Sequence, residues 1–225
     1  MFSTHLVFAS LVATIAGDNF QSQRPVPLQH VDAWRTVTQK EAFYLMYRSY
    51  EFDAGVGGTG ICVSLQLCDK NDTTRTATTR VMYRDAPMVE LRGFTVRTTM
   101  ARSWNSTVDD IVRHGDADNC SAPAHATTVE YRFVYSDYST CDVVVVFGTL
   151  EPKCELWVKD GYQKHVGGTF LAIFPPTNDV KGNITRCERE YERLCHVKYQ
   201  IYDKNICSSP PKWPQKDLQL TIGEK

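Results

Sequence analysis

The amino-acid sequence predicts a mainly β protein: an antiparallel barrel of eight strands with one C-terminal α-helix packed on its wall. Two observations predict this fold. Short runs rich in β-branched and aromatic residues recur at intervals of about 8 to 15 residues, separated by Gly, Asn and Asp. One late segment instead has the periodicity of an amphipathic helix. A barrel of this size is wide enough to hold one small ligand.

The elements follow one another in a simple order. Residues 31–38 suit a short helix or turn with Trp34 as its large buried group. Residues 101–126 are polar, and we expect a long loop there with one helical turn at 108–114. The runs predicted to be strands are 42–52, 61–67, 76–83, 90–100, 127–135, 142–147 and 155–158.

Residues 178–199 contain the predicted helix. Cys187, Tyr191, Leu194 and Cys195 are spaced i, i+4, i+7 and i+8, so they lie on one face of a helix. The two cysteines on this face could fasten the helix to the strands.

The start of the chain predicts export. Residues 1–17 contain no Lys, Arg, Asp or Glu, and their apolar run at 6–16 ends in small residues, which is the pattern of a signal peptide. We therefore expect a leader at 1–17, a linker at 18–30, the folded domain at 31–207 and a Pro-rich tail at 208–225. The mature protein is expected to be secreted and extracellular.

Cysteines and sequons fit that compartment. An even number of cysteines behind a leader predicts four disulfides, whereas the absence of CxxC and HxxxH patterns argues against a metal site. The cysteines are Cys62, Cys68, Cys120, Cys141, Cys154, Cys187, Cys195 and Cys207. Candidate N-glycosylation sites are Asn71, Asn105, Asn119 and Asn183, each in an N-x-[ST] sequon.

The charge balance and the absence of catalytic motifs exclude several classes of function. The 25 basic and 26 acidic residues are evenly spread, which argues against nucleic acid or a membrane surface as partner. After the leader no apolar stretch approaches the roughly 20 residues of a membrane span. The sequence has no G-x-S-x-G, no phosphate loop and no metal-binding His pair. We therefore expect a monomeric binding protein without a cofactor, and not an enzyme.

Three acids lie in or beside strands made of aromatic and β-branched residues: Asp53, Asp142 and Glu155. A buried carboxylate needs a cation or strong hydrogen-bond donors, because its burial costs several kcal/mol. A small amine would supply the cation, and aromatic faces would add about 1–2 kcal/mol of cation–π attraction. The alternative is that these acids end strands, where they face solvent or cap turns.

Several segments resemble a known family. They are Asp32-Ala33-Trp34, residues 43–53 (FYLMYRSYEFD), Cys62 in ICVSL, residues 135–143 (YSDYSTCDV) and Cys154-Glu155-Leu156-Trp157. Over residues 30–207 the chain resembles the tick salivary lipocalins and is most similar to the histamine-binding proteins. This resemblance implies an eight-stranded lipocalin barrel that binds and sequesters a host amine, histamine or serotonin, and so suppresses host inflammation.

The resemblance also implies disulfides Cys62–Cys207 and Cys141–Cys187. For the remaining cysteines we expect Cys154–Cys195, tying a strand to the helix, and Cys68–Cys120, pinning the long loop, although spacing does not determine connectivity.

The family's amine sites transfer in part. Tyr50, Asp53 and Glu155 match positions of the tighter histamine site, and Asp142 matches an acid of the second site. Trp157 matches a tryptophan beside the acidic position, and its alternative role is core packing.

Other positions depart from the family pattern. Val56 stands where the family has a tryptophan. On the strand at 127–135, Val129 and Tyr131 are expected to point inward, so Glu130 points outward unless the register slips.

Arg48 favours a different ligand. On a regular strand it shares the parity of Tyr50 and could face the barrel interior, where a guanidinium would bind an anion such as a leukotriene or fatty acid. Alternatively, a bulge turns Arg48 outward, or it pairs with Glu155 or another acid. A third possibility is a protein-binding immune modulator that uses its glycosylated long loop.

Overall fold

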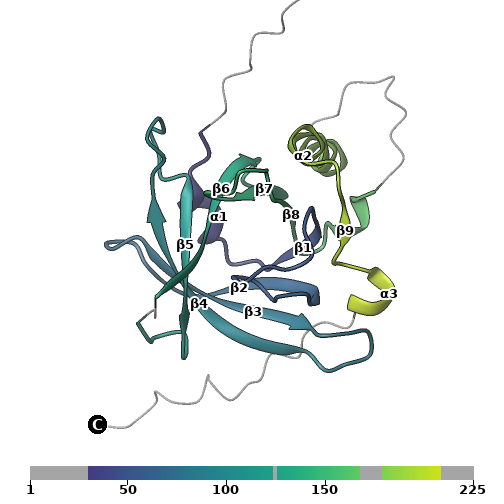
Figure 1. Cartoon of the computed structure of the whole chain (residues 1–225), viewed down its shortest axis with the longest axis horizontal. Coiled ribbons are helices and arrows are strands. Elements are labelled where there is room, and N and C mark those ends of the chain that lie inside the picture. The colour runs from purple at the N-terminus through teal and green to yellow at the C-terminus, as the bar shows by residue number, and fades with distance from the viewer. Residues whose placement is uncertain (1–29, 124–125, 168–178, 209–225) are drawn as a thin grey trace, which may run out of the picture.

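The computed structural model describes residues 30–123, 126–167 and 179–208, and within them eight antiparallel strands form a closed barrel (Figure 1). Each strand pairs with the next one in sequence, and the first also pairs with the eighth, which closes the ring. The strands are β1 Phe43–Arg48, β2 Ile61–Asn71, β3 Thr76–Arg84, β4 Arg92–Ala101, β5 Ile111–Ala117, β6 Thr127–Ser136, β7 Cys141–Val146 and β8 Cys154–Lys159. The predicted fold class is confirmed.

Helices and one short strand complete the domain. The helix α2, Val180–Leu194, lies outside the barrel wall against β7 and β8 (Figure 1). Its buried face includes Ile184, Cys187 and Tyr191, close to the face expected from the sequence. The remaining elements are α1 Ala33–Val37, the 3-10 turn η1 Gln163–His165, β9 Tyr199–Gln200, which pairs with β1, and α3 Lys204–Cys207.

The structure corrects the prediction for residues 101–126. The segment expected to be a loop contains β5, which pairs with β4 and β6, and residues 111–114 belong to this strand and not to a helical turn. Val112 and His114 are buried whereas Arg113 is exposed, which is the alternation of a strand with one face inside the barrel. The backbone groups of this polar segment gain ladder partners on both sides.

Two further boundaries differ. The strand expected at 42–52 ends at Arg48, and a loop over residues 49–60 follows, closed by the backbone pair Asp53–Gly58. Gly57 and Gly58 both have positive φ angles, 86° and 61°, which glycine adopts without strain. The helix expected at 178–199 ends at Leu194, because Cys195 adopts an extended conformation.

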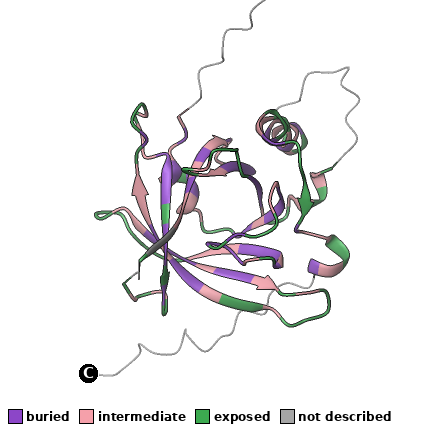
Figure 2. Ribbon diagram, in the orientation of Figure 1, coloured by how far each residue is buried: buried purple, intermediate pink, exposed green. Residues whose placement is uncertain are grey.

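Buried residues form two cores, one on each side of the barrel wall. Figure 2 shows the buried stretches along the strands and α2 that contribute to them. The inner core fills the barrel and includes Leu45, Val56 and Trp157. The outer core lies between the wall and α2 and includes Leu156 and Tyr191. Because both faces of β1, β7 and β8 are covered, these strands are buried almost throughout.

Four disulfides fasten the domain. The structure joins Cys62 to Cys207, Cys68 to Cys120, Cys141 to Cys187 and Cys154 to Cys195, which are the pairs expected above. The last two connect α2 to β7 and β8.

The sequons lie on different elements. Asn71, Asn105 and Asn119 are exposed, whereas Asn183 is half-buried on α2. The predicted leader and nearly all of the predicted linker and tail lie outside the described residues. Among the described helices, none is long and apolar enough to cross a membrane.

Candidate functional site

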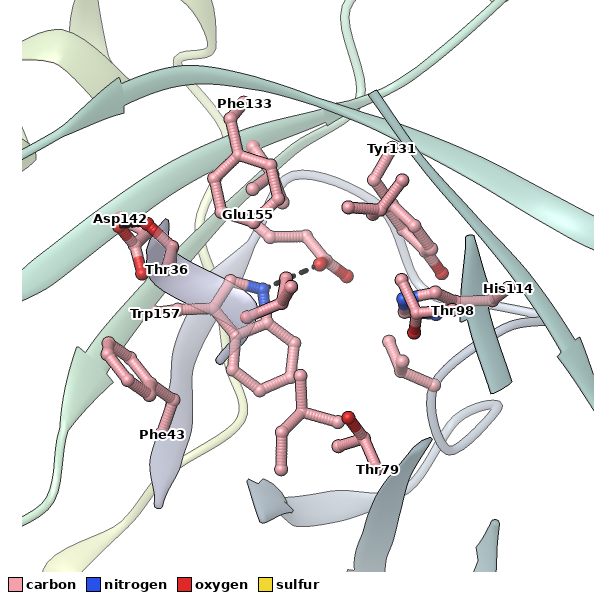
Figure 3. A pocket seen from close by; sticks show the side chains of 15 residues that line it. Thr36, Phe43, Thr79, Thr98, His114, Tyr131, Phe133, Asp142, Glu155 and Trp157 are labelled. Atoms are coloured by element: carbon pink, nitrogen blue, oxygen red, sulfur yellow. Dashed lines mark hydrogen bonds between the residues drawn. The ribbon is translucent and has the colours of Figure 1, made fainter. Parts of the chain in front are cut away.

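A cavity lies inside the barrel between the inward-facing side chains of several strands (Figure 3). Its volume is ≈ 70 Å³, room for about two water molecules at the volume each occupies in the liquid. Ionisable side chains enter it from four strands, His114 of β5, Tyr131 of β6, Asp142 of β7 and Glu155 of β8, and threonine hydroxyls enter from α1, β3 and β4. The rest of the lining is mainly apolar and aromatic.

Glu155 is placed in the cavity by the alternation of β8. Leu156 packs in the outer core, so Glu155 and Trp157 point inward. The carboxyl group is 1% exposed. The indole Nε1 of Trp157 donates a hydrogen bond of 2.8 Å to Glu155 Oε2 (Figure 3). The Tyr50 hydroxyl lies 2.8 Å from Oε1. Burial, with the nearby charge of Asp53, raises the pKa of Glu155 to about 8.

Asp53 lies behind this wall, in the loop of residues 49–60, and does not line the cavity. Its Oδ1 accepts the backbone N–H groups of Gly55 at 2.7 Å and Val56 at 2.8 Å, and also the Tyr131 hydroxyl. The Tyr50 hydroxyl donates to its Oδ2. Asp53 therefore organises its loop and two tyrosines while being almost completely buried.

Arg48 is completely buried, and a bulge places it there. Between Leu45 and Tyr47 the register with β8 shifts, so that both Met46 and Tyr47 pack in the outer core. The next residue, Arg48, then turns to the inner side. The alternative that a bulge turns Arg48 outward is therefore wrong, because the bulge in β1 turns this side chain inward.

The guanidinium of Arg48 holds the loop that follows it. Its Nη2 donates to the carbonyl oxygens of Glu51 at 2.7 Å and Gly58 at 2.6 Å. Its Nε and Nη1 have no hydrogen-bond partner among the described residues. Glu155 is its neighbour across the β1–β8 ladder, yet no salt bridge within the described chain joins the two. Among the described residues, Arg48 therefore forms no direct ion pair with an acid, in contrast to one of the alternatives given above.

His114 is a cavity residue that the sequence reasoning missed. It is buried beside Tyr131, with the ring centroids 5.1 Å apart. Burial lowers the pKa of His114 to about 4, against the opposing effect of Asp53, so the imidazole is neutral at pH 7. The alternation of Val112, Arg113 and His114 was the available signal, but it lay in a segment expected to be a loop.

Asp142 is the second acid of the cavity. It is 3% exposed and accepts a long hydrogen bond of 3.5 Å from the Thr36 hydroxyl of α1. Burial raises the pKa of Asp142 to about 7. Figure 3 shows it beside Thr36, on the other side of Trp157 from Glu155. The cavity therefore has an acid at each of two separate places.

The predicted site residues thus separate into two groups. Glu155, Asp142 and Trp157 line the cavity. The other three do not line it: Tyr50 bonds to Glu155, Asp53 accepts from Tyr131, and Arg48 holds the loop of residues 49–60. Glu130 forms a salt bridge of 2.8 Å with Arg113 on the outer face, as expected from its parity on β6. Among the described residues, no group of three or more His, Cys, Asp or Glu side chains could hold a metal ion.

Comparisons with known proteins give the context of this site. A male-specific histamine-binding salivary protein of Rhipicephalus appendiculatus is 25% identical over 134 residues, which are 57% of this chain and 64% of that relative. Insecticyanin of the tobacco hornworm Manduca sexta has a similar structure, with a TM-score of 0.50 and 8% identity over 80% of this chain and 86% of that one. Japanin of R. appendiculatus, solved with cholesterol, gives a TM-score of 0.46 and 15% identity over 75% of this chain and 97% of that one.

The barrel is that of the lipocalins. The family model described as tick histamine binding protein matches residues 22–209, which include the whole barrel, α2 and all four disulfides. The chain therefore belongs to the tick histamine-binding protein family.

Proposed function

We propose that this protein binds a small biogenic amine, histamine or serotonin, inside its barrel and sequesters it without transforming it. The observation that carries the proposal is Glu155. Its carboxyl group lines the cavity, is 1% exposed and forms no salt bridge with any described residue. A buried carboxylate is costly unless a cation compensates it, and an ammonium group fills that role.

The surrounding residues suit an ammonium group. Trp157 and Tyr50 hold the two oxygens of Glu155, so the orientation of the carboxylate is fixed before a ligand arrives. The indole of Trp157 and the phenol of Tyr131 also line or border the cavity and offer aromatic faces for cation–π attraction. The name of the related R. appendiculatus protein supports a histamine-like ligand.

Entry of an amine requires movement of the wall. A cavity of ≈ 70 Å³ is less than half of the 150 Å³ or so that holds a benzene molecule in an engineered core. The loop of residues 49–60 crosses the interior, since a Cβ on Gly55 would lie 2.5 Å from the Tyr131 hydroxyl of β6. We infer that this loop and the adjacent side chains shift when the ligand binds.

Secretion is part of the same proposal. Disulfides persist in extracellular compartments, and the leader pattern at 1–17 would direct the chain there. In host tissue such a protein lowers the free concentration of an inflammatory mediator by mass action. It acts stoichiometrically, so it must be delivered in amounts comparable with those of its ligand.

Calorimetric titration of the secreted protein with histamine and serotonin tests the proposal. The double variant Glu155→Gln with Asp53→Asn should bind the amine about a hundredfold more weakly or worse, since it removes both carboxylates of the cluster. Glu130→Gln removes a surface carboxylate on β6 and should leave the affinity unchanged. An unchanged affinity in the double variant would show that the amine does not bind at Glu155 and Asp53.

One observation favours a second candidate, a carboxylate-bearing lipid. Arg48 is fully buried and leaves Nε and Nη1 without partners in the described structure, although it lies outside the cavity lining. An anionic group would satisfy both N–H groups. Titration with leukotriene B4 tests this candidate: binding that is lost in Arg48→Met supports it, and binding of amines alone rejects it.

A further inference from the structure

We propose that the amine displaces a proton from Glu155, so that binding releases about one proton to solvent at neutral pH. This inference rests on the proposed amine site and concerns how that site is occupied. It divides the two acids of the cluster: Glu155 carries the exchangeable proton and receives the ammonium group, whereas Asp53 stays charged and positions the loop and the tyrosines.

The Tyr50 hydroxyl has one hydrogen but two carboxyl neighbours. Its hydroxyl oxygen lies within hydrogen-bonding distance of Asp53 Oδ2 and 2.8 Å from Glu155 Oε1. A hydroxyl group has a single hydrogen, so it donates to one of these oxygens at a time. If both carboxyl groups were ionised, the other contact would bring two lone pairs together. One of the two acids therefore carries the missing proton.

The hydrogen-bond donors decide which acid carries it. Asp53 accepts from two backbone N–H groups and from the Tyr131 and Tyr50 hydroxyls, and such donors stabilise the charged form of a carboxyl group. Glu155 has one N–H donor, the indole of Trp157. The proton therefore resides on Glu155 Oε1 and is donated to the oxygen of Tyr50, while Tyr50 donates to Asp53.

Charge balance gives the same assignment. Among the described residues, Glu155 interacts electrostatically with Arg48 and Asp53 of β1 and its loop and with Tyr50, Tyr131 and Tyr191, and His114 lines the same cavity. Arg48 is the cation among these groups and compensates one of the two carboxyl groups. His114 is neutral at pH 7, since burial lowers its pKa to about 4. The second carboxyl group is compensated by a proton, or by the ammonium group that replaces it.

The direction of the pKa shift agrees with this geometry. Burial and Asp53 raise the pKa of Glu155 to about 8, so the group is mainly protonated at pH 7. The ammonium group competes with this proton. The apparent affinity should therefore rise about tenfold per pH unit below pH 8 and level off above it. Asp142, at its separate place in the cavity, is the only other described cavity acid.

Calorimetry in buffers of different ionisation enthalpy measures the number of protons released on binding. Serotonin is titrated into the full-length secreted protein in phosphate and in Tris. The slope of observed heat against buffer ionisation enthalpy should correspond to release of nearly one proton at pH 7 and of clearly less at pH 8.5. Glu130→Gln, on the outer face of β6, should give the same release, because it changes neither the cavity nor Glu155.

A spectroscopic readout identifies the group. The infrared difference spectrum, bound minus free, should lose the carbonyl band of a protonated carboxylic acid in the wild-type protein, and Glu155→Gln should lack that band before serotonin is added. Serotonin binding with buffer-independent heats would overturn the displacement of a proton and leave the amine site intact. If neither serotonin nor histamine bound at all, the proposed function would fail together with this inference.

Discussion

The buried acid Glu155 should make the stability of the protein fall as pH rises, in the absence of any ligand. Its pKa in the folded state is raised from 4.5 to about 8, so between these values the folded state binds a proton that the unfolded state has lost. The contribution to stability is fully present below pH 4.5 and disappears as pH rises through 8. Between pH 5 and pH 9, this linkage decreases the free energy of unfolding by up to about 4 kcal/mol.

Urea unfolding at a series of pH values, followed by tryptophan fluorescence, measures this change. In Glu155→Gln the amide resembles the protonated acid: its oxygen can accept from Trp157 and its N–H can donate to Tyr50. The variant should therefore match the wild-type stability near pH 5 and exceed it increasingly toward pH 9. Glu130→Gln, which alters the net charge equally at the surface, serves as the matched control.

The comparison between variants isolates Glu155, since Asp142 titrates in all of them and cancels in the difference. The reasoning is refuted if wild type and Glu155→Gln lose stability in parallel from pH 5 to pH 9, because then the carboxyl group of Glu155 would titrate alike in the folded and unfolded states.

Three further outcomes follow from single contacts. Gly55→Ala places a Cβ 2.5 Å from the Tyr131 hydroxyl, which should separate Tyr131 from the adjacent acid and weaken serotonin binding about tenfold by calorimetry; an unchanged affinity would show that this loop position is not coupled to the site. Replacing Cys154 and Cys195 by Ala opens a bridge spanning 41 residues and should lower the free energy of unfolding by about 4 kcal/mol in urea, with no effect if α2 is held by packing alone. Asp142→Asn should reduce the loss of stability between pH 6 and pH 8, because burial raises the pKa of that acid to about 7; an unaltered pH profile would contradict this.

The barrel and part of the site could be predicted because they depend on local patterns. The two-residue alternation of β8 places Glu155 inward, and the same alternation on β7 places Asp142 inward. The resemblance to the tick proteins added two of the four disulfides, Cys62–Cys207 and Cys141–Cys187. By contrast, β5 was missed because its polar residues and the sequons around it are typical of a loop, while its pairing partners are distant in sequence.

The interactions behind the cavity could not be predicted from a pattern. The parity of Arg48 depends on a bulge at Met46 and Tyr47, and nothing in the sequence of β1 marks a bulge there. The hydrogen bonds of Asp53 depend on the path of the loop after β1, which the prediction treated as strand up to residue 52. Of the acids singled out from the sequence, Glu155 and Asp142 line the cavity whereas Asp53 does not, and this separation comes from contacts between segments.

The loop of residues 49–60 and the proposed amine site depend on the same side chains. Asp53 fixes the loop of residues 49–60 through the N–H groups of Gly55 and Val56, and it reaches Glu155 through Tyr50. Arg48 also holds this loop, because its Nη2 donates to the carbonyl oxygens of Glu51 and Gly58. Any movement of Glu155 toward a ligand alters the hydrogen bond of Tyr50 and hence the bonds of Asp53. Because a cavity of this size must enlarge to admit the proposed amine, we expect the loop of residues 49–60 to move together with Glu155 when that ligand binds.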